Sequence, residues 1–341
     1  FSTNVSVDHQ DTFKSAELID GQTIRIYGDE STTAGNRSIN YQYYLVEFTF
    51  DSAINVQHTT LAVTSNQTSK TINNVNVNTT MLVYSGHSCN QVDPGDSDIG
   101  NAEIDKIELI SSTSWEWTTE TAPTGPQNVR VQVVDWGDTE IDVQRGVVNF
   151  AAGSLTTLTL SNGYDYNTVD ITRTILHVTY RTNGASSAED SNKIALEATL
   201  DSSGNIVFSR NTTIGVSLDI SWELIEFPPD FVSVQHATIQ IPSGLGGTFN
   251  SATISTVDLT RSIPLGTVFV PTSFSGSISV VNTSSTNLYC CRVLLLDSST
   301  VRAIRESNTG VCDIGVQILE FEVPYSSSSS SSNSSSSSSS S

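Results

Sequence analysis

The chain has 341 residues, of which 37% are apolar and only 15% charged, and its 15 basic and 36 acidic residues give a net charge of −21 at pH 7. Such an acidic surface repels phosphate backbones and anionic lipid headgroups, so the composition argues against nucleic-acid binding and membrane-surface binding. The sequence contains no apolar run long enough for a membrane helix, so we expect no membrane insertion. Cations, sugars and other proteins remain as candidate partners.

The N-terminal segment alternates apolar and polar residues, with Phe1, Thr3, Val5 and Val7 on one face. This pattern predicts an amphipathic strand, which we interpret as adding to an incomplete sheet of a neighbouring subunit. Pairing within residues 1–53 and the trimming of a longer array are the alternatives. Because neither an initiating Met nor a signal segment precedes Phe1, we also expect a processed or trimmed start.

Three further strands are expected before residue 53, at 16–19, 23–27 and 39–48. They match only the last three strands of the period that organises the rest of the chain. Half a β-sandwich exposes its core face and an unpaired sheet edge, so another segment has to complete it. A different choice of boundary makes 284–325 the incomplete half instead.

Three sequence markers recur in the same order with a period of about 90 residues, which identifies a tandem repeat. The first marker is an apolar-acidic-aromatic ending, found as Leu45-Val46-Glu47-Phe48, Val133-Val134-Asp135-Trp136, Leu224-Ile225-Glu226-Phe227 and Ile318-Leu319-Glu320-Phe321. The second is Val-Gln-basic, found as Val56-Gln57-His58, Val143-Gln144-Arg145 and Val234-Gln235-His236. The third is found as Val75-Asn76-Val77-Asn78-Thr79-Thr80, Val169-Asp170-Ile171-Thr172-Arg173-Thr174 and Val257-Asp258-Leu259-Thr260-Arg261-Ser262.

Within each period the hydrophobic pattern has period two, the signature of strands with one buried face. It is clearest over 216–224, whereas Ile225-Glu226-Phe227 slips the alternation and predicts a bulge or a strand that crosses between sheets. About six short strands per period predict an all-β fold of tandem antiparallel β-sandwich repeats of about 90 residues, with one incomplete repeat. The expected segments are 1–52 (an N-terminal strand plus a half repeat), 53–140, 141–231 and 232–325 (three β-sandwich repeats) and 326–341 (a serine-rich tail).

The five histidines form no catalytic pattern with their neighbours. His58 and His236 occupy the repeat position that holds Arg145 in the middle repeat, so we interpret all three residues as cations over a sheet edge. The sequence also lacks a nucleophile elbow, a zinc-protease motif, a phosphate-binding glycine loop and a dinucleotide fingerprint. We therefore expect no enzymatic activity and no catalytic residues.

Three carboxylates, Asp93, Asp96 and Asp98, lie close together in one predicted turn. Carboxylates at this spacing repel one another unless a cation bridges them, and calcium prefers oxygen ligands. The pattern predicts either a calcium site or a solvated acidic loop. No other cofactor is expected.

Of the four cysteines, Cys290, Cys291 and Cys312 cluster late in the chain. Because no Cys-x-x-Cys spacing occurs, they favour a local disulfide over a metal site, joining Cys312 to Cys290 or Cys291. In the chain-entropy model such a bridge contributes about 3 kcal/mol. The other vicinal cysteine and Cys89 are then either free or joined between subunits.

Glycosylation sequons and the serine tail both bear on location. Asn-x-Ser/Thr sequons occur at Asn4, Asn36, Asn66, Asn78, Asn211, Asn282 and Asn333. With the cysteine usage, they favour an extracellular or cell-surface location. The serine tail has no core-forming residues, so it predicts a flexible linker or an O-glycosylated stalk, unless it stands for residues of unknown identity.

Two groups of aromatic residues are candidate platforms for stacking sugars: Tyr41, Tyr43 and Tyr44, and the pair Trp115 and Trp117. Tyr41 and Tyr43 lie on the core phase of a predicted strand, whereas the two tryptophans fall outside the aligned strands of the repeat. We expect core or loop packing for these rings, with sugar stacking as the alternative.

The middle repeat resembles a known class of modules. The run Val143-Gln144-Arg145-Gly146, the stretches 151–160 and 169–174, and a closing Trp-x-x-x-Glu-Phe resemble tandem β-sandwich repeats of prokaryotic extracellular surface and appendage proteins and of some phage fibres. They are also distantly similar to H-type lectin modules. The resemblance covers most of 53–325, implies an extracellular structural or adhesive role, and supplies no catalytic residues.

These features together predict a structural subunit of an extracellular assembly, such as a filament, sheath or surface layer, that binds further copies of itself by strand addition. The alternative is a carbohydrate-binding adhesin or a phage-type receptor-binding fibre module, with surface glycans as its partners.

Overall fold

The computed structural model describes residues 15–20, 23–27, 54–89, 106–120, 122, 127–137, 140–153, 156–183, 196–210, 217–242, 248–271, 292–304 and 311–322. Nearly all of these residues lie in or between antiparallel strands, which confirms the predicted all-β fold. The described helical segment is a short 3-10 helix, η2 (Ile171–Arg173). Among the described residues, no helix is long and apolar enough to cross a membrane.

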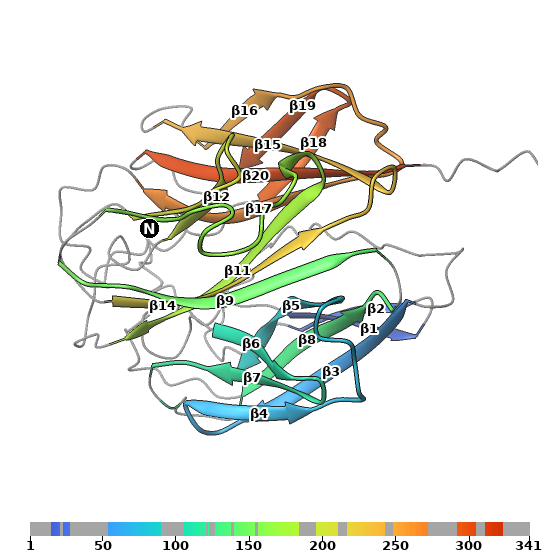
Figure 1. The fold of residues 1–341 in the computed structure, drawn as a ribbon, viewed down its shortest axis with the longest axis vertical. Helices are drawn as coiled ribbons and strands as arrows, with labels where there is room; N and C mark the ends of the chain where they lie inside the picture. Colours follow the sequence, from blue (N-terminus) through green and yellow to red (C-terminus); the bar gives the residue numbers. More distant parts are fainter. Residues whose placement is uncertain are drawn as a thin grey trace, which may run out of the picture.

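Three successive groups of six strands, here called units 1, 2 and 3, are stacked along the longest axis of the molecule (Figure 1). In each unit the first, sixth and third strands form one sheet, with the sixth in the centre. The second, fifth and fourth strands form the other sheet, with the fifth in the centre. The third and fourth strands of every unit are therefore edge strands of their sheets.

Unit 1 contains β3 (Asn55–Val63), β4 (Gln67–Thr71), β5 (Thr80–Cys89), β6 (Lys106–Ser111), β7 (Ser114–Thr118) and β8 (Gln127–Asp135). Unit 2 contains β9 (Asp142–Phe150), β10 (Thr157–Leu160), β11 (Thr174–Asn183), β12 (Glu197–Leu200), β13 (Ile206–Ser209) and β14 (Ser217–Glu226). Unit 3 contains β15 (Val232–Ile241), β16 (Phe249–Thr253), β17 (Ser262–Pro271), β18 (Arg292–Asp297), β19 (Thr300–Ile304) and β20 (Cys312–Phe321). The predicted domain boundaries stay predictions.

A separate hairpin, β1 (Ser15–Asp20) and β2 (Thr23–Tyr27), precedes unit 1. Its register breaks between Leu18 and Asp20, at the place where the register of β6 with β7 breaks in unit 1 and that of β18 with β19 breaks in unit 3. The hairpin therefore corresponds to the fourth and fifth strands of a unit. The strand expected at 39–48 lies outside the described residues.

Each unit has its own apolar core between its two sheets. In unit 2, Leu218, Ile220 and Leu224 of β14 are fully buried, as the alternation over 216–224 predicts. The intervening Ser221 and Glu223 are buried as well, because the outer face of this sheet lies against unit 1. Thus β14 has two buried faces, where the alternation alone predicts one.

The prediction of a bulge or of a strand crossing between sheets at Ile225-Glu226-Phe227 is wrong, since neither occurs through Glu226. The register of β14 with β9 and with β11 is continuous through Glu226. Leu224 faces the core of unit 2, whereas Ile225 points to the opposite side of the sheet, into an apolar cluster shared with its neighbours. The alternation slips because both faces are buried at this end of the strand.

Gly146 makes room for a large ring in the core of unit 2. It lies opposite Trp222 in the register, and a Cβ atom added to Gly146 would stand 2.6 Å from Cζ2 of that ring. We expect Gly146→Val to lower the free energy of unfolding by about 1–3 kcal/mol, because the added side chain would collide with the buried ring. Urea denaturation followed by tryptophan fluorescence measures this loss.

The control for this prediction is Val147→Ala at the next, exposed position of the same strand. We expect it to change stability by less than about 0.5 kcal/mol. Equal midpoints for Gly146→Val and the control would contradict the steric role of Gly146.

Candidate functional site: the joints between units

The predicted calcium ligands Asp93, Asp96 and Asp98 lie outside the described residues. Among the side chains that are described, no group of three or more His, Cys, Asp or Glu residues is placed to hold a metal ion. The calcium site stays a prediction.

The cysteine pairing is equally open. Cys312 is buried in the core of unit 3. Cys290 and Cys291 lie outside the described residues, and Cys89 is described only as the last residue of β5. The disulfide between Cys312 and one of the vicinal pair stays a prediction.

Two of the predicted glycosylation sites are described, and both Asn66 and Asn78 are exposed. The other sequons and the predicted inter-subunit strand lie outside the described residues, namely Asn4, Asn36, Asn211, Asn282 and Asn333, and Phe1, Thr3, Val5 and Val7. Modification at Asn66 and Asn78 is sterically open, since a glycan needs an asparagine that faces solvent.

Trp115 and Trp117 lie on β7 and are fully buried in the core of unit 1. The ring nitrogen of Trp115 donates a hydrogen bond to Oγ1 of Thr59, at 3.2 Å. The expectation of core packing is therefore confirmed for both tryptophans, and neither ring is open to a sugar. Tyr41, Tyr43 and Tyr44 lie outside the described residues.

The acid of the first sequence marker holds the third marker within the same unit. In unit 3, Oε1 of Glu320 accepts hydrogen bonds from the backbone N–H of Asp258, at 2.9 Å, and from Nη2 of Arg261, at 3.3 Å. In unit 2, Glu226 accepts from the same two positions, Asp170 and Arg173. Unit 1 keeps the backbone contact, from Asn76 to Asp135, at 3.2 Å.

The third marker is also held by its own aspartate. Oδ1 of Asp258 accepts from both the N–H and the hydroxyl of Thr260, at 2.9 and 2.7 Å, and Asp170 accepts from Thr172 in the same way. These hydrogen bonds lower the pKa of Asp258 to about 2. The loop is thus a rigid turn whose carbonyl groups have fixed directions.

The glutamine of the second marker makes a two-way clamp to the backbone just before the third marker. In unit 1, Nε2 of Gln57 donates to the carbonyl of Asn73 and Oε1 accepts from its N–H, at 3.2 and 2.8 Å. Gln144 clamps Asn167 and Gln235 clamps Ser255 with the same pair of bonds. This amide ties the first strand of each unit to the connection between its second and third strands.

The basic residue of the second marker reaches into the preceding unit. Arg145 of unit 2 donates from Nη1 to the carbonyl of Val77 and from Nη2 to the carbonyl of Thr80, both in the third marker of unit 1. His236 of unit 3 contacts the carbonyl of Ile171 through Nε2, at 3.0 Å. Ile171 holds in unit 2 the marker position that Val77 holds in unit 1, so the two joints are built in the same way.

The sixth strand supplies a second contact to each joint. Glu223 of unit 2 accepts a hydrogen bond from the backbone N–H of Leu82 on β5, at 3.0 Å. In unit 3, Gln317 accepts from the N–H of Leu176 on β11 and donates to its carbonyl, at 2.7 and 2.8 Å. Leu82 and Leu176 hold the same place on the third strand, so each unit recognises the backbone of an edge strand in the unit before it.

The first joint is charged and buried. Glu223 pairs with Nε of Arg145 at 3.2 Å and approaches Nδ1 of His177 at 3.6 Å. Burial by itself raises the pKa of Glu223, but the contacts with His177, Arg145 and Leu82 outweigh it and the net pKa is lowered. The carboxylate is therefore ionised and depends on these partners to stay buried.

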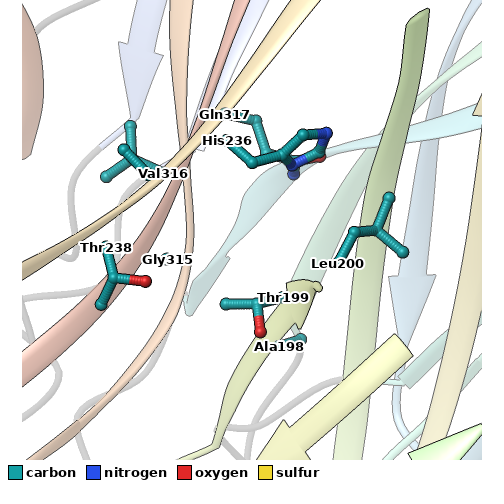
Figure 2. A pocket seen from close by; sticks show the side chains of 9 residues that line it. Ala198, Thr199, Leu200, His236, Thr238, Gly315, Val316 and Gln317 are labelled. Atoms are coloured by element: carbon teal, nitrogen blue, oxygen red, sulfur yellow. The ribbon is translucent and has the colours of Figure 1, made fainter. Parts of the chain in front are cut away.

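The second joint replaces this charged pair with His236 and Gln317, which face each other across β15 and β20. Burial lowers the pKa of His236, although the carbonyls of Ile171 and Thr174 act in the opposite direction. A cavity of about 160 Å³ lies beside this pair, and Figure 2 shows His236 and Gln317 on one side of it and Thr199 and Leu200 on the other.

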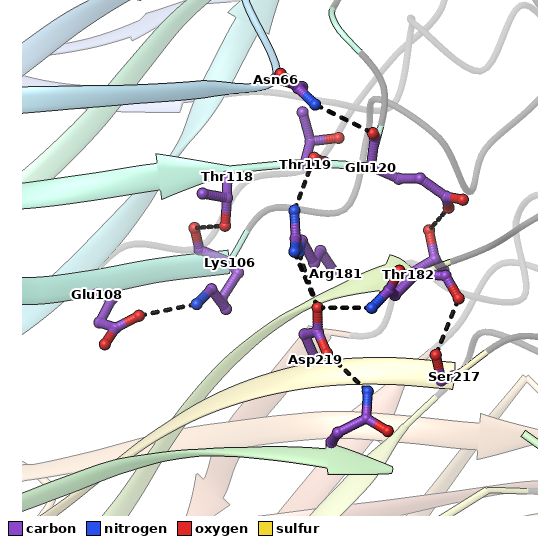
Figure 3. A network of polar contacts seen from close by, with 12 residues as sticks. Asn66, Lys106, Glu108, Thr118, Thr119, Glu120, Arg181, Thr182, Ser217 and Asp219 are labelled. Carbon is purple, nitrogen blue, oxygen red and sulfur yellow. Dashed lines mark hydrogen bonds and ion pairs between the residues drawn. The ribbon is translucent and has the colours of Figure 1, made fainter. Parts of the chain in front are cut away.

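A polar network extends the first joint toward the far end of the sheets (Figure 3). Arg181 of β11 pairs with Asp219 of β14 at 3.0 Å and donates from Nη1 to the carbonyl of Thr119 in unit 1, at 3.3 Å. The hydroxyl of Thr182 donates to Oε2 of Glu120, at 2.5 Å. Unit 1 and unit 2 are therefore connected at both ends of β11.

An apolar cluster runs between the units where the first marker ends each sixth strand. It combines apolar and aromatic marker residues of all three units with residues on or next to first and third strands, namely Val134, Trp136, Ile141, Val143, Ile175, Ile225, Phe227, Val232, Val234 and Leu319. Trp136 packs edge-on against Phe227, with 5.8 Å between ring centroids. Both halves of the first marker thus serve the joints, the acid through the loop and the hydrophobic residues through this cluster.

A groove of about 650 Å³ opens beside the first joint. Arg145, Asp142, Ile110 and Asn78 contribute to its lining. Residues of both units line the groove, and Arg145, which holds the joint, is one of them, so the groove is a consequence of the docking of unit 2 on unit 1.

Comparison with known proteins adds no relative: no family model, no curated protein and no solved structure matches the chain. The joints are therefore interpreted from their own geometry.

The sequence markers located half of each joint. They include Arg145 and His236, but they omit Glu223 and Gln317, because these residues alternate with core residues and have the polarity expected of solvent-facing positions. Their shared spacing from the first marker was a usable signal. Their partners, Leu82 and Leu176, give no signal, since they contribute only backbone atoms.

Proposed function

We propose that the chain is a structural subunit of an extracellular assembly, a filament, sheath or surface layer, which polymerises by β-strand addition between subunits. One observation carries the proposal. The residues that recur along the chain build unit-to-unit joints, so docking of one unit on the next is the property that the repeat preserves.

The form of the joints supports this proposal. Each joint covers edge strands of the preceding unit and satisfies some of their backbone groups, as at Leu82 and Leu176. Edge strands left open pair readily with strands of other chains. A stack of such units is therefore suited to growth at its ends, and the exposed Asn66 and Asn78 are compatible with glycosylation outside the cell.

Negative-stain electron microscopy of the native chain and of a chain lacking residues 1–9 tests the proposal. We expect ordered fibres from the native chain and their loss on truncation, since Phe1, Thr3, Val5 and Val7 form the predicted added strand. Isolated rods in both samples, together with retention on a glycan array, would instead identify an adhesin.

A further inference from the structure

Both joints use one kind of docking surface, formed by the third and fourth strands of the preceding unit. In unit 1, β6 lies against β11 and β14 of unit 2, and in unit 2, β12 lies against β17 and β20 of unit 3. The partner face is always the outer face of the sheet that contains the first, sixth and third strands. The hairpin strand β1 lies against β5 and β8 of unit 1, which are the corresponding strands.

Unit 3 has the same edge, formed by β17 and β18. In the described part of the chain, the main contacts of β18 are with β17 and β19 of its own unit. Val293 and Leu295 are only half-buried there, whereas their counterparts in units 1 and 2 are buried, namely Ile107, Leu109, Ala198 and Leu200. Leu259, which holds the marker position of Val77 and Ile171 in the two joints, is 50% exposed. Within the part of the chain that the structure describes, no other unit covers this edge, which is built like the edges in the two joints.

Pro264 restricts what this edge can bind. Pro264 is the third-strand equivalent of Leu82 and Leu176, whose N–H groups anchor the two joints. The registers establish this equivalence, since Pro264 pairs with Ile318, Leu82 with Val133 and Leu176 with Leu224. Proline has no N–H, and only its carbonyl can take part. A carboxylate such as that of Glu223 would be buried there without a donor, whereas an amide such as that of Gln317 would still find the carbonyl.

The outer face of unit 1 has the matching chemistry. His58 lies opposite Gln132, as His236 lies opposite Gln317. Among the described residues, neither His58 nor Gln132 has a side-chain hydrogen bond to another residue. The Arg145 and Glu223 face does not match, because its carboxylate would meet Pro264.

We propose that the edge formed by β17 and β18 of unit 3 binds the outer face of unit 1 of a second copy of this chain, in exchange for the hairpin β1–β2 of that copy. The inference rests on the proposed self-assembly and names the surfaces that meet. The shared register break makes β1 and β18 equivalent strands, so they compete for one position. A two-stranded hairpin is only marginally stable by itself, which makes the exchange accessible.

The first test measures self-association of the full chain by sedimentation velocity and electron microscopy, with the variant Leu259→Glu. We expect the native chain to associate head to tail and the variant to lose affinity by about tenfold or more, since a charge replaces apolar contacts. Tyr164→Glu, at an exposed loop position of unit 2, is the matched control and should associate like the native chain. Equal association of native chain and edge variant overturns the proposal.

The second test uses the complementarity of Gln132 and Pro264. Gln132→Glu should weaken association by about tenfold, because the carboxylate lacks a donor, and Pro264→Leu should restore it by returning the N–H group found at Leu82 and Leu176. A double variant no better than Gln132→Glu alone overturns the pairing. Fibres that form equally in all variants overturn this edge but leave self-assembly standing, whereas a native chain that stays monomeric overturns both.

Discussion

Replacing Arg145 with alanine is expected to lower the free energy of unfolding by about 3 kcal/mol, because it leaves a buried ion without its main partner. Glu223 stays ionised between the units only through its contacts with Arg145, His177 and the N–H of Leu82. The substitution also removes the donors to the carbonyls of Val77 and Thr80. The loss should appear first at the joint between unit 1 and unit 2.

Urea denaturation gives the size of this loss, and amide hydrogen exchange along β5 and β9 shows whether it is centred on the joint. Arg302→Ala is the control, because Arg302 stacks on Phe249 at the surface of unit 3, away from any described joint. Its effect should be about 1 kcal/mol or less.

The residues of the second joint suggest a double variant that should restore the stability of the first joint. The double variant Arg145→His/Glu223→Gln copies His236 and Gln317, which hold unit 3 on unit 2 without a buried charge. We expect it to recover most of the stability that Arg145→Ala loses, since it removes the ion along with its partner. A double variant as unstable as the alanine variant would show that the two joints do not share one design.

The strands and their period follow from the sequence because each strand alternates buried and exposed side chains. The joint partners do not follow, because Glu223 and Gln317 bind backbone atoms of Leu82 and Leu176, which any residue other than proline supplies. Such a contact constrains the sequence only at the residue that binds through its side chain, and not at the residue that contributes backbone atoms.

Trp115 and Trp117, which the sequence placed outside the aligned strands, lie on the fifth strand of unit 1. Their counterparts are Ile206 and Phe208 in unit 2 and Val301 and Ala303 in unit 3, and residues of such different volumes hide the alignment, because a core accepts many combinations of volumes.

The sequence failed most clearly to predict the buried polar residues on the outer faces of the sheets. Glu223 and Gln317 occupy polar positions in strands whose other residues form the core, so alternation assigns them to solvent. Their burial depends on which face the next unit covers. Contacts between units decide which face is covered, and the hydrophobic period within one strand contains no information about those contacts.

The pH dependence of the second joint is the other large effect that we expect. Burial first, and the nearby carboxylate of Asp313 second, raise the pKa of Glu197 on β12 from 4.5 to about 7. Between pH 4.5 and about pH 7, Glu197 is therefore protonated in the folded chain but ionised in the unfolded chain. Its contribution to stability is present below pH 4.5, is lost as the pH rises through this window, and stays lost above it.

Glu197→Gln should keep this contribution at every pH, because the amide resembles the protonated acid. We expect the variant to match the native chain at pH 4.5 and to exceed its free energy of unfolding at pH 8 by about 2 kcal/mol, after allowance for partial exposure. Thermal unfolding from pH 4 to pH 8 measures the difference. His236 shifts stability in the opposite direction, since its lowered pKa favours the folded chain above about pH 6.5, but it is common to both proteins and cancels in the comparison.

A second substitution separates repulsion from burial at Glu197. The corresponding fourth-strand position in unit 1 is Lys106, and the position of Asp313 corresponds to Asp219 in unit 2, so the first joint has a basic and an acidic residue at the two positions where the second joint has two acids. Glu197→Lys converts the repulsive contact with Asp313 into an attractive one but keeps a charge buried, so it should stabilise the second joint at pH 8 by less than Glu197→Gln. If Glu197→Lys instead destabilises the chain while Glu197→Gln stabilises it, burial of the charge, not repulsion by Asp313, controls this joint.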